Sequence, residues 1–179
     1  MNDEKLLQGE GIFLRPYVQV DGAYTVPDTF LLWLWARYEE EGTTAKVFRV
    51  SEVADGADFI DYMRMPGNLP VLFFADDQTP LGMAWLNGVS GNHAFVHHAL
   101  LKASWGRLTD AIAKVALGYW FGMRGASGFQ LDVLVGMTPS VNSKAVKYLQ
   151  RVGFTVVGQI PQMAEGEPMT ISYLERDNG

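Results

Sequence analysis

Apolar residues recur three or four positions apart in four segments of the chain, a spacing that predicts amphipathic helices. In the third segment, Leu108, Ile112 and Val115 follow one another at steps of four and three. Glycine, alone or after proline, follows three of the segments and favours an end to each helix. The predicted helices span Thr29–Glu41, Val53–Met65, Arg107–Met123 and Val141–Val152.

Shorter runs rich in apolar residues predict strands. They span Gly11–Val20, Val71–Ala75, Leu81–Asn87, His93–Leu101, Phe129–Val135, Phe154–Val157 and Met169–Leu174. Asp76–Gln78 and Ser90–Asn92 are short polar segments that predict hairpins. In contrast, a helix connects the strands His93–Leu101 and Phe129–Val135, and such a crossover is typical of a parallel pair. The pattern predicts an α+β fold with a mixed sheet and helices on both faces.

Composition and charge narrow the class of protein. The 179 residues are 48% hydrophobic and 19% charged, which is typical of one globular domain over residues 1–179. The chain has 14 basic and 20 acidic residues, and this net charge of -6 argues against nonspecific nucleic-acid binding. It contains no cysteine, so disulfides, cysteine metal sites and thiol nucleophiles are excluded.

The apolar stretches predict no targeting or membrane segment. The start, MNDEKLLQGEG, is polar and acidic and lacks the apolar region of a secretory signal. Charged residues interrupt the longest apolar stretches too early for a bilayer span. We therefore expect a cytoplasmic protein without membrane contact. Its five tryptophans and an aromatic first helix are compatible with a homodimer.

The first local motif is NSKAVKYLQRVGF, residues 142–154. Asn142 stands at a helix start, Ala145 follows three residues later, and Gly153 and Phe154 come at the helix end. A purely structural explanation exists for the last two residues: glycine can end a helix in a left-handed conformation while Phe154 packs back on Leu149.

The second motif is LKASWGRL, residues 101–108, between a strand and a helix. Backbone N–H groups at a helix start form a site for anions. Lys102 and Arg107 add positive charge, and Trp105 adds an apolar surface. The structural alternative is a loop with a buried tryptophan and two solvated basic residues.

The two motifs and the order of elements resemble the GNAT superfamily of acyl-CoA-dependent N-acetyltransferases. The resemblance is good over roughly the last hundred residues. Over roughly the first sixty residues it consists only in the order of the elements. The segment 142–154 is similar to the ribosomal-protein N-acetyltransferase branch. The resemblance implies a mostly antiparallel sheet with a central parallel strand pair.

The resemblance also implies acetyl-CoA as the acyl donor. The family holds the CoA pyrophosphate with a Gln/Arg-x-x-Gly-x-Gly/Ala loop. Gly106 matches this pattern, whereas Ala103 replaces Gln or Arg and Leu108 replaces the last small residue. Asn142 is expected on the pantetheine arm. The donor-binding residues implied are Leu101, Lys102, Trp105, Gly106, Arg107 and Asn142.

The three histidines supply candidates for a general base. In an extended strand, His93 and His97 point to one face and His98 to the other. A neutral imidazole can deprotonate an ammonium group, and His97 is our candidate base, with a structural role in the sheet as the alternative. Two histidines on one strand face without an evident carboxylate do not predict a metal site.

Tyr148 is the candidate general acid. Many members of the family use a tyrosine four residues before the glycine of Gly-Phe. Leu149 holds that position here, and Tyr148 lies one residue earlier, about 100° around the helix. Tyr148 could serve after a local shift of the helix; the alternative is core packing beside Ala145 and Val152.

The first helix carries an aromatic cluster where the family often builds part of its acceptor site: Phe30, Trp33, Trp35 and Tyr38. Trp33 and Trp35 lie on different sides, so we expect one to be exposed. The acidic runs Glu39–Glu41 and Asp76–Asp77 are most simply solvated. If either lines a cleft, it would favour a cationic acceptor such as a polyamine or a lysine-rich peptide.

These features predict an N-acetyltransferase that moves acetyl from acetyl-CoA to a primary amine of a small molecule or protein by direct attack. One alternative is a catalytically inactive binding or assembly module of the same fold, favoured by Ala103, Leu108 and Leu149. A second is an enzyme with another acyl or aminoacyl donor, and a third is an unrelated α+β ligand-binding domain.

Overall fold

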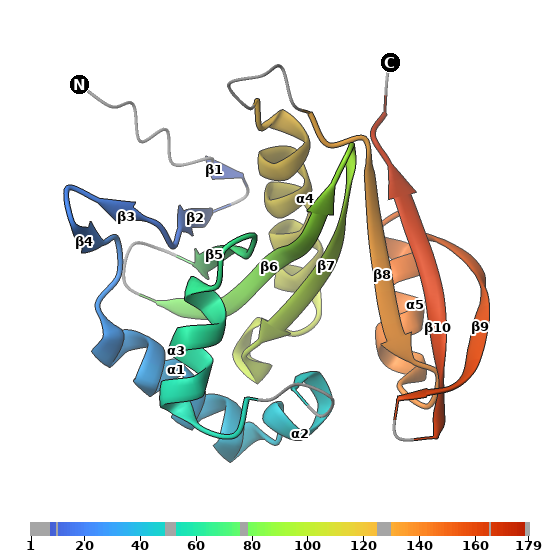
Figure 1. Ribbon diagram of the computed structural model, residues 1–179, viewed down its shortest axis with the longest axis horizontal. Helices are drawn as coiled ribbons and strands as arrows, with labels where there is room; N and C mark the ends of the chain where they lie inside the picture. Colours follow the sequence, from blue (N-terminus) through green and yellow to red (C-terminus); the bar gives the residue numbers. More distant parts are fainter. Residues whose placement is uncertain are drawn as a thin grey trace. The chain divides into compact units, whose positions relative to one another are not determined.

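The computed structural model describes residues 8–9, 11–48, 53–75, 79–124, 130–164 and 166–177. Its helices are α1 (Asp28–Glu41), α2 (Thr44–Val47), α3 (Gly56–Arg64), the 3₁₀ helix η1 (Lys102–Ser104), α4 (Arg107–Gly122) and α5 (Ser143–Arg151) (Figure 1). Its strands are β1 (Gln8–Gly9), β2 (Ile12–Pro16), β3 (Gln19–Val20), β4 (Ala23–Tyr24), β5 (Leu69–Phe74), β6 (Pro80–Ser90), β7 (His93–Leu100), β8 (Val133–Pro139), β9 (Thr155–Ala164) and β10 (Glu167–Glu175).

The chain forms two compact units. Unit 1 comprises Met1–Trp85 and His98–Tyr119, and unit 2 comprises Leu86–His97 and Trp120–Gly179. In unit 1 the strand order is β1-β2-β5-β6-β7, while β3 and β4 pair separately. In Figure 1, α3 lies in front of these strands and α4 lies behind them.

Unit 2 contains the parallel pair that the helical crossover predicts. Its strand order is β6-β7-β8-β10-β9. Strands β7 and β8 run parallel, from His93 opposite Val133 to Val96 opposite Gly136. Strand β10 is antiparallel to both β8 and β9. The prediction of an α+β fold with a mostly antiparallel sheet and one parallel pair is confirmed.

Aromatic side chains dominate the core of unit 1. The Trp35, Phe48 and Phe59 rings lie with centroids 5.3–5.5 Å apart. Phe48 also stacks on Trp85 at 5.5 Å with an interplanar angle of 5°. These rings are buried, and each removes a large apolar area from water. This core joins the buried face of α1 to α3 and β6.

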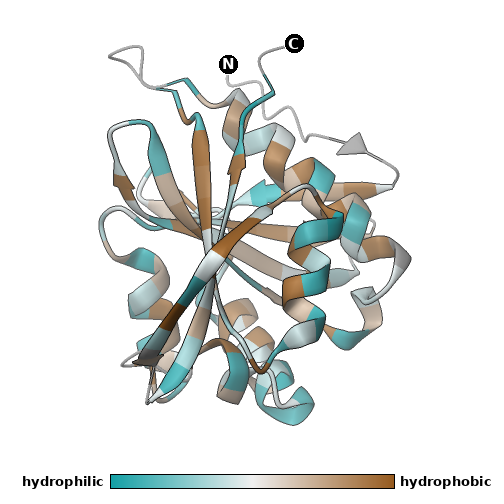
Figure 2. Ribbon diagram, turned by 90° about the vertical axis from the view of Figure 1, so that its right-hand side faces the viewer, coloured by the Kyte–Doolittle hydropathy of each residue, from teal (hydrophilic) through white to brown (hydrophobic). Residues whose placement is uncertain are grey.

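A close approach between β8 and its neighbours defines the centre of unit 2. A Cβ atom on Gly136 would lie 2.9 Å from the Ser172 hydroxyl, 3.4 Å from Leu149 and 3.7 Å from Phe154. Leu149 comes from α5, which is amphipathic; Figure 2 shows bands of hydrophobic and hydrophilic residues around the helices. The small residue at 136 therefore lets α5 and the start of β9 pack onto the sheet.

The predicted strand Gly11–Val20 is wrong in its second half. Strand β2 ends at Pro16, and Gln19–Val20 belongs to the separate β3–β4 hairpin. Its two-residue turn has positive φ angles at Asp21 (50°) and Gly22 (83°). Asp-Gly between short strands favours this type of turn, so it reverses the chain where a continuous strand was expected.

Other boundaries shift by local chemistry. Helix α3 begins at Gly56 because the Asp55 side chain accepts the N–H groups of Ala57 and Asp58. Strand β9 continues past Val157 to Ala164 although it contains Pro161, which an edge strand tolerates. The sequence pattern did not predict α2 or η1. The predicted hairpin loop Asp76–Gln78 and Phe129 lie outside the described residues.

Candidate functional site

The segment between β7 and α4, in unit 1, contains most of the predicted donor-binding residues. The N–H of Leu101 donates to the Leu81 carbonyl at 2.9 Å, and its buried side chain belongs to the core. Its carbonyl accepts both the N–H and the hydroxyl of Ser104, at 2.9 and 2.7 Å. Both backbone groups and the side chain of Leu101 are thus engaged within the protein, and its contact with the donor stays a prediction.

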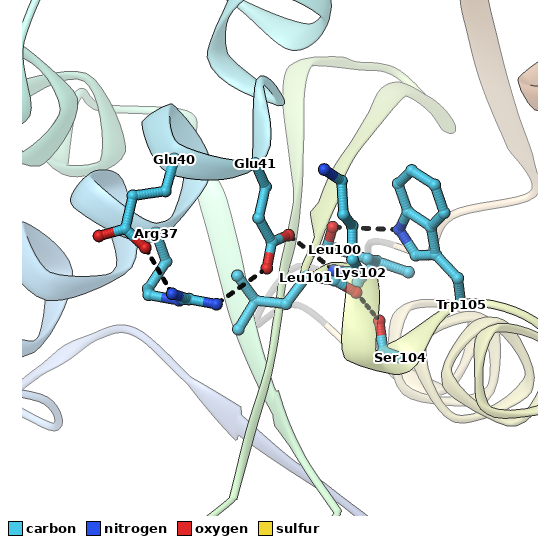
Figure 3. A network of polar contacts seen from close by, with 8 residues as sticks. All are labelled: Arg37, Glu40, Glu41, Leu100, Leu101, Lys102, Ser104 and Trp105. Atoms are coloured by element: carbon cyan, nitrogen blue, oxygen red, sulfur yellow. Dashed lines mark hydrogen bonds and ion pairs between the residues drawn. The ribbon is translucent and has the colours of Figure 1, made fainter.

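The next residues face solvent. Lys102 is exposed, and Trp105 is 53% exposed, which excludes the alternative of a buried tryptophan. The indole N–H of Trp105 donates to the Leu100 carbonyl at 3.4 Å (Figure 3). The segment thus presents one cationic and one aromatic side chain at the surface of unit 1.

Gly106 brings the backbone to the start of α4. Its φ is +89°, and no atom lies within 4 Å of the position that a Cβ atom would take. Helix α4 begins at Arg107, so the first-turn N–H groups have no partner one turn earlier in the helix. Among the described residues, no hydrogen bond takes the N–H of Gly106 or Leu108. These amides can donate hydrogen bonds to an anion, and the positive end of the helix dipole favours its binding.

A carboxylate from α1 contacts the beginning of this loop. The Glu41 side chain is 8% exposed and accepts the Lys102 N–H at 2.7 Å (Figure 3). Its other oxygen lies 3.2 Å from the Arg37 guanidinium, which also pairs with Glu40. The prediction that the run Glu39–Glu41 is solvated is wrong for Glu41.

Sequence reasoning missed Glu41 although a signal was present. Glu41 follows Leu34 by seven residues and Tyr38 by three, so it shares the helix face that both bury. A carboxylate on a buried face needs a charged or hydrogen-bonding partner. Arg37, four residues earlier, was the visible partner within the helix.

Tyr38 fixes the strand end that leads into the loop. Its hydroxyl donates to the Ala99 carbonyl at 2.5 Å, and burial raises the pKa of Tyr38 well above its usual range. The group therefore stays protonated as a donor at physiological pH. On the same helix Trp35 is buried and Trp33 is 42% exposed, as their opposite positions predict.

Asn142, in unit 2, caps α5. Its side-chain oxygen accepts the Ala145 N–H at 3.3 Å. At the other end, Gly153 has φ +104°, and the Phe154 N–H donates to the Leu149 carbonyl at 2.9 Å. This is a Schellman end, so the structural explanation of Gly-Phe is confirmed.

Two substitutions separate the cap from a contact between Asn142 and the donor. Serine also caps helices, so we expect Asn142→Ser to keep wild-type stability and Asn142→Ala to lose about 1 kcal/mol in urea unfolding. Both remove the amide, so calorimetry should give about tenfold weaker binding of CoA and dephospho-CoA alike. Wild-type affinity in Asn142→Ser would restrict Asn142 to capping.

The tyrosine position expected for a general acid holds a buried leucine. Leu149 is 7% exposed and packs close to Gly136. A leucine side chain has no acidic proton, so Leu149 cannot act as the general acid. Tyr148 is half-buried, and the Arg151 guanidinium lies over its ring at 5.4 Å. Tyr148 is therefore outside the buried core, and its role as an acid stays a prediction.

His97 contacts Asn87 within unit 2. Its Nε2 lies 3.0 Å from the Asn87 amide oxygen. An amide oxygen only accepts, so Nε2 donates and Nδ1 is the basic nitrogen of the neutral ring. The ring is half-buried. This arrangement orients the imidazole that we select as candidate base.

His98, in unit 1, is held neutral by its surroundings. Burial lowers the pKa of His98 below its ordinary value of 6.5. As pH falls through 6.5, the unfolded chain takes up a proton that the folded chain does not, so stability falls with pH. Between about pH 7.5 and 5.5 we expect the free energy of unfolding to fall less in His98→Gln than in wild type. The two slopes should differ by up to about 1.4 kcal/mol per pH unit. Urea unfolding at both values checks this. With His93→Gln as the control, an unchanged pH dependence in His98→Gln would contradict it.

Neither a metal site nor a membrane span is found among the described residues. No cluster of three or more histidine or acidic side chains there is arranged to hold a metal ion. No helix in the described ranges is long and apolar enough to cross a membrane.

Comparisons with known proteins find structural likeness without sequence likeness. No family model matches the chain, and no curated protein sequence matches it. The ribosomal-protein-S5-alanine acetyltransferase from Vibrio fischeri superposes with a TM-score of 0.69 at 10% identity, covering 96% of each chain. Spermidine N-acetyltransferase from Vibrio cholerae, in complex with CoA and spermine, has a TM-score of 0.73 at 12% identity, covering 93% of this chain and 96% of that one. A dodecameric structure of the latter enzyme superposes with a TM-score of 0.67 at 12% identity, covering 93% of this chain and 95% of that one.

Proposed function

We propose that this chain, which has the fold of the GNAT acetyltransferases, binds acetyl-CoA and transfers its acetyl group to a primary amine. One observation carries the proposal. Gly106 has φ +89° and free space where a Cβ atom would lie, and it directly precedes the 16-residue helix α4. The backbone amides at this helix start are available to an anion. A pyrophosphate is such an anion.

Residues of the same loop would hold the donor. The backbone of Trp105, Gly106 and Arg107 would bind the pyrophosphate, and Lys102 would add positive charge. The exposed Trp105 ring offers an apolar surface to the adenine or the pantetheine. In unit 2, the resemblance gives Asn142 to the pantetheine arm. The loop fits the donor despite Ala103 and Leu108, because backbone groups supply the anion contacts.

The transfer needs few catalytic side chains. The neutral amine nitrogen forms a bond to the thioester carbonyl carbon, the carbon–sulfur bond breaks, and the thiolate takes up a proton as the amide forms. Holding both reactants together supplies much of the rate. A base that takes the proton from the ammonium form of the substrate, and so supplies the neutral amine, adds a further factor.

We assign that base to His97. We expect His97→Gln to lower kcat by about 100-fold, because glutamine can hydrogen-bond to Asn87 but cannot take the proton. Steady-state rates at saturating acetyl-CoA measure the effect, with His93→Gln as the control on the same strand. An unchanged kcat in His97→Gln would leave His97 a structural residue of the sheet.

Acyl transfer can be tested directly from the release of free CoA. The chain contains no cysteine, so a thiol reagent detects CoA alone. The two enzymes superposed above are named for spermidine and for a ribosomal protein, so polyamines and amino-terminal peptides are the first acceptors to test. Amine-dependent thiol release with an acetylated product by mass spectrometry supports the proposal.

A non-catalytic binding module is the second candidate. Leu149, at the position of the general acid, and Ala103 and Leu108, in the loop, favour it. A protein that binds CoA but acetylates none of the amines would support donor binding without transfer. A protein that binds no acyl-CoA would favour an assembly role, with a protein partner to be sought.

A further inference from the structure

The short helix η1 opens the loop without a cap of its own. Leu101 occupies its N-cap position and makes no side-chain hydrogen bond there. A leucine cannot satisfy the free N–H groups of a first turn. The N–H of Lys102 instead donates to Glu41, which lies 61 positions earlier in the sequence. The beginning of the loop is thus fastened by another helix.

Glu41 occupies an unfavourable place in its own helix. The last turn of α1 contains no basic residue, and carboxylates at a helix C-terminus oppose the helix dipole. The Glu41 side chain is also only 8% exposed. Its contacts with the Arg37 guanidinium and the Lys102 N–H offset both costs. The carboxylate therefore has defined partners on both oxygens.

Arg37 sets the net charge beside the start of the loop, because its guanidinium pairs with Glu41. The guanidinium neutralises the carboxylate that lies against the backbone of Lys102 (Figure 3). Without Arg37, a nearly buried negative charge would remain at the start of a segment that binds an anion. Two residues of α1 thus act together, one on the position of the loop and one on its charge.

We propose that Glu41 is a positioning residue for the donor-binding loop, with Arg37 as its neutralising partner. The proposal rests on the proposed function. Glu41 holds the loop in one conformation before the donor arrives, so less ordering is needed on binding. We assign Glu41 no contact with the donor or with the reacting atoms, because both of its carboxylate oxygens are occupied by Arg37 and Lys102.

Four variants test the two roles separately by calorimetric titration with CoA. Glu41→Ala removes the acceptor, and we expect about tenfold weaker binding. Glu41→Gln keeps an oxygen for the Lys102 N–H, so binding should stay within about threefold of wild type. Arg37→Ala leaves the carboxylate unpaired and should weaken binding about tenfold, whereas Arg37→Ala with Glu41→Gln should restore it. Glu39→Ala, an equal change of charge on the exposed side of α1, is the control.

Rescue by glutamine distinguishes positioning from general stability. Urea unfolding of each variant shows whether the fold is intact at the titration temperature. Glu41→Ala at wild-type affinity, or Glu41→Gln as weak as Glu41→Ala, would overturn the role of Glu41. A wild-type protein that binds no CoA would overturn the proposed function instead. Full agreement with the expected pattern supports both.

Discussion

Gly106→Asp should abolish detectable CoA binding, with affinity lowered about 1000-fold. Two effects add. The residue at 106 needs φ near +89°, which costs an aspartate about 1–3 kcal/mol. Its carboxylate would also stand beside the amides that we assign to the pyrophosphate, and juxtaposed like charges cost several kcal/mol. Calorimetric titration with CoA measures the loss.

Gly106→Asn is the matched control, because asparagine has the shape of aspartate without its charge and tolerates positive φ. We expect at most about tenfold weaker binding from the strain. Space is not limiting, since nothing lies within 4 Å of the added Cβ atom. Equal affinity in Gly106→Asp and wild type would remove the pyrophosphate from this loop.

Gly82→Ala should destabilise the protein by about 4 kcal/mol, the sum of overpacking and backbone strain. Gly82 has φ +124°, and a Cβ atom there would lie 2.5 Å from the Ala99 carbonyl oxygen and 2.7 Å from the Leu100 Cα. The Ala99 oxygen also accepts the buried Tyr38 hydroxyl, so it cannot move freely. Urea unfolding gives the free-energy difference.

Gly118→Ala provides the comparison. Gly118 lies inside α4 with open space around a Cβ atom, so alanine there should stabilise the protein by about 0.5–1 kcal/mol. If Gly82→Ala unfolds at the same urea concentration as wild type, β6 does not approach the end of β7 as closely as the structure places it. Because this approach precedes the loop directly, the Gly82 variant should also bind CoA less tightly.

The sequence predicted those features that depend on neighbouring residues. Apolar spacing located α4 to within one residue at its end, and Gly153 with Phe154 predicted the Schellman end of α5. Opposite positions on one helix distinguished buried Trp35 from exposed Trp33. In each case the determining contacts lie within a few turns of the same helix.

The sequence failed where distant segments determine the outcome. The nearly buried Glu41 carboxylate accepts a hydrogen bond from the Lys102 N–H, 61 residues away in the sequence, and no local pattern contains that contact. Likewise, β9 extends to Ala164 because β10 pairs with it as far as Glu167. The β3–β4 turn is different, because Asp21-Gly22 is a local signal for a hairpin turn. The apolar residues before it favoured one continuous strand, so the turn was not predicted.

Calorimetric titration of the wild-type protein with acetyl-CoA and, separately, with CoA shows whether the start of α4 is a working donor site. Amides at the start of α4 that donate to the pyrophosphate predict saturable binding of both ligands at about micromolar concentrations, with one molecule per chain. No binding at about millimolar ligand would overturn the proposed function, because the acetyltransferase fold would then be present without a functional donor site.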